Sequence, residues 1–152
     1  MKIRKKATNV FKTAVEATPD IENCYQEGLR AFGGYSAKVA LSSNCEGSVD
    51  IDACVVGKYP HDNRWDYVFG YKSKAYFVEV HSASSSEVSV VIRKLSWLKS
   101  WLNTNAPELN KIKADVPFYW IQSGKFDIPK TSRHYRLAVT HGIKPISRLI
   151  LD

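Results

Sequence analysis

The longest regular pattern of apolar residues lies in the middle of the chain. Apolar residues recur there at the spacing of one helix face, at Val88, Val91, Ile92, Leu95, Leu98 and Leu102. This pattern predicts a long amphipathic helix. The preceding SSSE fits a capping box, with Ser84 as N-cap and Glu87 at the third helical position. Residues 103–107 end the helix.

Alternating and aromatic-rich segments on both sides of this helix predict strands. Residues 65–71 and 75–81 read as a hairpin whose short turn is Lys-Ser-Lys. In residues 48–56 apolar Val49, Ile51, Ala53 and Val55 alternate with polar positions, which is typical of a half-buried strand. The remaining predicted strands are residues 36–41, 116–122 and 145–151.

Three further segments predict helices. Residues 9–17 have apolar side chains on one side, and Thr18-Pro19-Asp20 has the composition of a helix start. The second helix then runs through Phe32 and ends at Gly33-Gly34, and the third covers residues 131–141 and ends at Gly142.

The order of these elements indicates the fold class. Helix, helix, three strands, helix, strand, helix and strand predict an α/β protein with a mixed central sheet and helices on both faces. The crossovers around residues 84–116 and 123–145 are long enough to make the last strands parallel.

Length and charge narrow the class of protein. A chain of 152 residues is the size of one domain, with residues 1–8 as a flexible basic tail. The net charge of +7 favours a polyanionic partner such as DNA. The start, MKIRKKATNVFK, lacks the apolar run of a signal peptide, and no segment approaches a membrane span. We therefore expect a cytoplasmic protein without a membrane partner.

The three cysteines are Cys24, Cys45 and Cys54, and they are widely spaced. Their odd number and the lack of a CxxC pair argue against a zinc site or a disulfide framework. The sequence predicts free thiols in a reducing compartment.

The hairpin brings acidic residues together. If Lys72 and Ser73 form a two-residue turn, Asp66 lies opposite Glu79, and Glu79 shares a face of the sheet with His81. Two carboxylates on one apolar face need a positive partner. That partner is either a divalent cation or a lysine or arginine from a neighbouring helix. A register slip of one residue would instead send Asp66 to the other face.

The helix, the three strands with WDYVF and VEVHSA, and the helix and strand that follow resemble the PD-(D/E)XK restriction-endonuclease-like nucleases. The resemblance covers residues 18–122 and implies an αβββαβ core, here followed by a C-terminal helix and strand. It implies that Asp66, Glu79 and the Val80 carbonyl bind Mg²⁺ or Mn²⁺. It also implies an additional acid, for which the candidates are Glu22 or Glu27 on the first helix. Asp50 or Asp52 is a weaker substitute for Asp66.

One position departs from the motif. His81 stands where these nucleases have lysine, and neutral imidazole offsets less phosphate charge than an ammonium does. Either His81 serves as a base, or Lys94 on the following helix supplies the charge. Otherwise the site is catalytically degenerate.

The resemblance therefore leaves two functional classes. One is a Mg²⁺-dependent endodeoxyribonuclease, and the other is a scaffold or protein-interaction domain on the same fold without enzymatic activity. Lys5, Lys6 and Arg133 are candidate nucleic-acid contacts, because basic groups at a tail or a helix start can meet phosphates. An exposed Trp97–Trp101 pair would indicate a homodimer.

Overall fold

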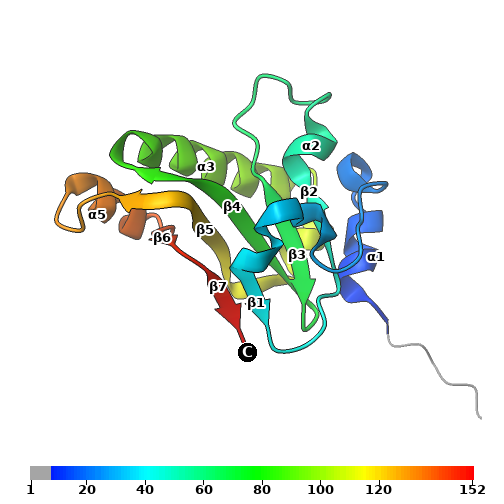
Figure 1. The fold of residues 1–152 in the computed structure, drawn as a ribbon. Coiled ribbons are helices and arrows are strands. Elements are labelled where there is room, and N and C mark those ends of the chain that lie inside the picture. The colour runs from blue at the N-terminus through cyan, green and yellow to red at the C-terminus, as the bar shows by residue number, and fades with distance from the viewer. Residues whose placement is uncertain (1–7) are drawn as a thin grey trace, which may run out of the picture.

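A five-stranded mixed sheet forms the centre of the protein, seen in a computed structural model that describes residues 8–152 (Figure 1). Its strand order is β2-β3-β4-β5-β6, and a separate two-stranded sheet pairs β1 with β7. The strands are β1 (Val39–Leu41), β2 (Gly47–Asp50), β3 (Tyr67–Tyr71), β4 (Lys74–Ser84), β5 (Lys113–Asp127), β6 (Pro145–Ile146) and β7 (Leu149–Leu151).

Helices connect and cover these strands. The α-helices are α1 (Val10–Glu16), α2 (Ile51–Val55), α3 (Val88–Thr104), α4 (Pro107–Lys111) and α5 (Arg133–Thr140). The 3₁₀-helices are η1 (Pro19–Ile21), η2 (Arg30–Lys38) and η3 (Ser85–Glu87). The predicted mixed α/β class is confirmed, and so are the amphipathic helix α3 and the helices α1 and α5.

The pairing in the main sheet changes from antiparallel to parallel at β4. The strands β2, β3 and β4 are paired antiparallel, whereas β4 with β5 and β5 with β6 are parallel. The crossovers through α3 and α5 therefore produce the parallel pairs that their length predicts. In Figure 1 the helix α3 runs along one side of the sheet, and η2 lies on the other.

Both faces of the sheet are buried, because neighbouring residues of one strand enter different cores. Val68 and Phe77 pack with α1 and α3 in the larger core. Phe69 and Val78 pack with Phe32 of η2 and with the β1–β7 pair in the smaller one. This two-sided burial explains why the hairpin strands are apolar at nearly every position.

The β3–β4 hairpin has the register that the sequence predicts. Tyr71 pairs with Lys74 and Tyr67 with Val78. The turn residues Lys72 and Ser73 both have positive φ, 50° and 63°, which is the conformation that the twist of a two-residue hairpin needs. Neither is glycine, but the Ser73 N–H donates to the Glu46 carboxylate at 2.8 Å and so helps to hold the turn.

Two of the predicted elements are wrong. In residues 48–56 only the β2 part is extended, and Ile51–Val55 is the helix α2, because the Asp50 side chain accepts from the Ala53 N–H and caps it. The helix from Thr18 to Phe32 does not form either. Between η1 and η2 the chain is irregular, with an antiparallel bridge from Gln26 to Ser48 and positive φ at Gly28.

Several boundaries also differ from the predicted ones, among them those of β5, which runs over Lys113–Asp127 and not only over residues 116–122. Residues 36–38 belong to η2, so the first strand is only Val39–Leu41. The predicted last strand divides into β6, which extends the main sheet, and β7, which pairs with β1. The capping box does not form, because helix α3 is preceded by η3 and Ser84 makes no capping hydrogen bond.

The two tryptophans of α3 contact η1 and the loop after α2. The Trp101 indole donates to Asp20 and the Trp97 indole to Asp62, and the two rings stack 5.7 Å apart. Trp101 is buried. The pair is thus an intramolecular contact and not the exposed aromatic patch from which a homodimer would follow.

A disulfide joins Cys24 to Cys54, across a Cα–Cα distance of 6.3 Å, and Cys45 alone is a free thiol. The prediction of three free thiols is therefore wrong. Spacing along the chain did not reveal the pair, because it depends on how α2 packs against the irregular segment after η1. Within residues 8–152, no helix combines the length and the apolar character that a membrane crossing requires.

We expect reduction of this disulfide to destabilise the fold. The bridge closes a loop with a sequence separation of 30, which corresponds to about 3–4 kcal/mol of unfolding free energy in the chain-entropy model. Urea unfolding with and without reductant measures the effect, and Cys24→Ser should remove the dependence on reductant. Cys45→Ser is the matched control and should retain it. Equal stability of the oxidised and reduced wild-type protein would contradict the bridge.

Candidate active site

Two carboxylates meet where β3 begins beside β4. Asp66 directly precedes β3, and Glu79 lies in the middle of β4. The Asp66 N–H donates to Glu79 Oε1 at 3.1 Å, and the Val80 N–H donates to Asp66 Oδ2 at 3.0 Å. The Glu79 carboxylate is therefore held by the backbone of Asp66, and the Asp66 carboxylate by the backbone of the residue after Glu79. The Asp66 carbonyl in turn accepts from the Ile51 N–H at 2.8 Å, which ties the site to α2.

A lysine from α3 completes the cluster. Lys94 Nζ lies 3.4 Å from Asp66 Oδ1 and forms an ion pair with Glu79 Oε2. Glu79 is fully buried, and the side chains of Asp66 and Lys94 are only 19% and 15% exposed. A buried carboxylate persists only when it is paired, so the ammonium provides the positive charge that the hairpin requires.

His81 forms the outer edge of the cluster. It follows Glu79 on the same face of β4, and its Nδ1 lies 3.5 Å from Glu79 Oε2. Its Nε2 contacts Glu87 Oε2 at 2.8 Å, and its carbonyl accepts from the Trp120 indole at 3.0 Å. Glu87 thus binds the histidine instead of capping the helix. This contact was not predicted, although Glu87 at the start of the helix is only six residues from His81.

The low-dielectric surroundings shift the pKa values of the cluster. Burial, and then the Glu79 charge, raise the pKa of Asp66 to about 7. Burial works to lower the pKa of Lys94, but the charges of Glu79 and Asp66 outweigh it and the pKa lies above its usual value. The hydrogen bond to Glu79, with a second from Glu87, raises the pKa of His81 against the effect of burial.

The donor set is suited to a hard divalent cation. Mg²⁺ commonly takes one or two protein carboxylates and fills its other positions with water and substrate phosphates. Asp66 and Glu79 supply two adjacent carboxylates, and Val80 lies beside them. Within residues 8–152 there is no group of three or more His, Cys, Asp or Glu side chains arranged to hold a metal. Asp66 and Glu79 alone form no closed cage for a metal, and Lys94 already pairs with both of them.

The other acidic candidates lie outside this cluster. Glu22 and Glu27 are exposed, and the helix that was predicted to carry them is absent. Asp52 pairs with Arg64 at 2.7 Å, and Asp50 caps α2. Only Asp66 among the three aspartates contacts the same lysine as Glu79.

Of the three candidate nucleic-acid contacts, only Arg133 lies within the described residues. Lys5 and Lys6 lie outside the described residues. Arg133 is exposed in the first turn of α5, after the Ser132 side chain that caps this helix through the Tyr135 N–H.

No protein-family model, curated protein or solved structure matches the chain. The function is therefore inferred from the contacts of the site itself.

The raised pKa of Asp66 predicts a pH-dependent stability in the presence of a chelator. Between pH 3.8, the ordinary pKa, and about 7, the folded protein keeps a proton that the unfolded chain loses. The free energy of unfolding should therefore fall over this window and level off above it. Asp66→Asn removes the effect, so its stability relative to wild type should rise by on the order of 2–4 kcal/mol between pH 4 and pH 8.

Urea unfolding at a series of pH values measures this difference. The exposed Asp115→Asn on β5 is the matched control, and its stability relative to wild type should stay constant over the same range. A pH-independent difference for Asp66→Asn would show that the carboxyl group is not perturbed.

Proposed function

We propose that the protein is a PD-(D/E)XK-like nuclease that hydrolyses phosphodiester bonds in DNA with the help of a divalent cation. The observation that carries this proposal is the convergence of Asp66, Glu79 and Lys94 from a hairpin and the helix that follows it. Two carboxylates and one ammonium, held within contact of one another, are the side-chain types that the motif requires.

The order of the elements supports the same proposal. The strands β2, β3 and β4 are antiparallel neighbours, with α2 inserted between β2 and β3, and α3 and α4 lead to β5, which is parallel to β4. The first helix of the expected core, residues 18–32, does not form, and α1 lies before that range. The βββαβ part of this order would be the counterpart of the core of those nucleases. The helix α5 and the strand β6 would be additions to that core.

Lys94 would supply the positive charge that the motif expects at the position of His81. The motif has its lysine two residues after the glutamate, on the same strand, where this chain has histidine. The ammonium of Lys94 reaches the Glu79 carboxylate from α3 instead. The positive charge is thus retained while its position in the sequence changes, and it would offset the negative charge that develops on the phosphate.

Each residue then has a defined part. Asp66 and Glu79 would hold Mg²⁺ or Mn²⁺, together with the Val80 carbonyl. When bound, such a cation stabilises charge on phosphoryl oxygens and lowers the pKa of a coordinated water. His81, whose pKa is raised by the hydrogen bond to Glu79, can hold or release a proton at the edge of the site. The net charge of +7 would favour approach of the DNA.

One observation favours the second candidate, a non-catalytic scaffold on this fold. Lys94 pairs with both carboxylates, and an ion-pair cluster of this kind can stabilise a fold without any cation. In that case Asp66, Glu79 and Lys94 would be structural, and DNA binding, if present, would be independent of them.

Cleavage assays separate the two candidates. Plasmid, linear and branched DNA are incubated with Mg²⁺ or Mn²⁺ and with wild type, Asp66→Asn or Glu79→Gln. Loss of one metal-binding carboxylate should reduce the cleavage rate on the order of a hundredfold or more, whereas Asp115→Asn should cleave like wild type. Absence of cleavage by pure wild-type protein on all three substrates would support the scaffold.

The position of the lysine gives a separate prediction. Lys94→Gln should reduce cleavage on the order of a hundredfold, since it removes charge stabilisation at the phosphate. The exposed Lys99→Gln on the same helix is the control and should have little effect. His81→Lys should partly restore the Lys94→Gln variant, because it returns the ammonium to the position that the motif uses. Full activity of Lys94→Gln alone would exclude the assigned role.

A further inference from the structure

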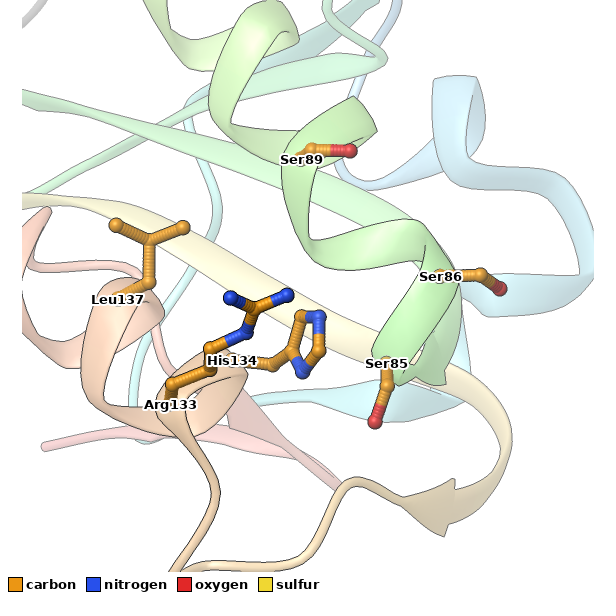
Figure 2. Close-up of a pocket in the computed structure, with 6 residues that line it drawn as sticks. All are labelled: Ser85, Ser86, Ser89, Arg133, His134 and Leu137. Carbon is orange, nitrogen blue, oxygen red and sulfur yellow. The ribbon is translucent and has the colours of Figure 1, made fainter.

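A cavity of about 390 Å³ lies between the start of α3 and the start of α5 (Figure 2). The segment from η3 into α3 forms one wall, and the first turn of α5 forms the other. The lining residues are Ser85, Ser86, Ser89, Arg133, His134 and Leu137. We name it the serine–arginine pocket.

The basic residues of the pocket suit a phosphate group. Its lining includes one arginine, one histidine and three serines, and none of the lining residues is acidic. Figure 2 shows the hydroxyls of Ser86 and Ser89 turned away from Arg133 and His134. Figure 2 shows the side chains of Arg133 and His134 pointing from α5 towards the start of α3, where Ser85 lies opposite. The guanidinium fork matches phosphate oxygens in a bidentate geometry.

Arg133 is available for such a ligand. Among residues 8–152 its guanidinium takes part in no salt bridge. Leu137 is 43% exposed and adds an apolar wall, against which the sugar of a nucleotide could pack. An exposed leucine beside an uncompensated arginine suits a sugar–phosphate backbone better than a free inorganic ion.

The pocket adjoins the candidate active site through one short segment. Glu87 follows Ser86 and precedes Ser89, and its carboxylate contacts His81 at 2.8 Å. His81 in turn contacts Glu79 at 3.5 Å. The acidic residue of this segment is therefore directed to the catalytic side, while the serines on either side of it line the pocket.

We infer that the serine–arginine pocket binds a backbone phosphate of the DNA that flanks the phosphodiester bond to be cleaved. The inference rests on the proposed function, because it takes the substrate to be DNA. It assigns to Arg133 a positioning role, since the guanidinium would fix the strand relative to Asp66 and Glu79 without contacting the reacting atoms. It also assigns a role in DNA binding to α5, which lies outside the proposed αβββαβ core.

The salt dependence of DNA binding tests this inference independently of cleavage. The dissociation constant of a short duplex is measured over a series of NaCl concentrations, in a chelator so that no hydrolysis occurs. Loss of one phosphate contact in Arg133→Gln should reduce the magnitude of the slope of log K against log[salt] by about 0.9. Arg136→Gln is the matched control, because Arg136 is on the same helix, is exposed, and does not line the pocket.

Each outcome decides the question. A reduced slope for Arg133→Gln, with an unchanged slope for Arg136→Gln, supports the pocket whether or not the protein cleaves DNA. Equal slopes for wild type and both variants overturn it, even if cleavage is observed, because Arg133 then contacts no phosphate. Absence of DNA binding by wild type also overturns it. The cleavage assays with Asp66→Asn and Glu79→Gln judge the proposed function separately.

Discussion

The ion pair between the buried carboxylate of Glu79 and the ammonium of Lys94 is the contact on which the rest of the site depends. Glu79 has no exposed surface, and an unpaired charge there would cost several kcal/mol. The pair therefore requires α3 to dock with Lys94 facing the sheet. It also requires the hairpin register that places Glu79 on that face, because a slip of one residue would turn it to the other core.

The same burial destabilises the charged form of the site and perturbs the pKa values of its groups. Burial beside Glu79 raises the pKa of Asp66 to about 7, so one lysine does not fully compensate two carboxylates. A cation gains from both carboxylates, since each interaction is stronger at low dielectric.

The sequence was informative where one local rule decided the structure. The two-residue turn at Lys72 and Ser73 gave the hairpin register, and the apolar spacing gave α3. The alternation in residues 48–56 predicted a strand incorrectly, because the spacing of Ile51 and Val55 fits both a strand and a helix. The cap that Asp50 provides favours the helix. For Lys94 the sequence left a choice, since its reach to Glu79 depends on how α3 docks.

What could not be predicted depends on tertiary packing. The Cys24–Cys54 bridge joins segments whose approach follows from α2, an element that the pattern did not indicate. The contact of Glu87 with His81 replaces the capping box that its spacing favoured. The serine–arginine pocket likewise arises only when α5 packs beside the start of α3, although Arg133 was already a candidate contact from its place at a helix start.

Binding of Mn²⁺, followed through the loss of its free electron paramagnetic resonance signal, tests the central claim most directly. The account predicts that the wild-type protein binds Mn²⁺ at a site that Asp66→Asn and Glu79→Gln each weaken strongly and that Asp115→Asn leaves unchanged. Binding with equal affinity in all four proteins, or no binding to the wild type in the presence of DNA, would contradict a metal-dependent centre at Asp66 and Glu79.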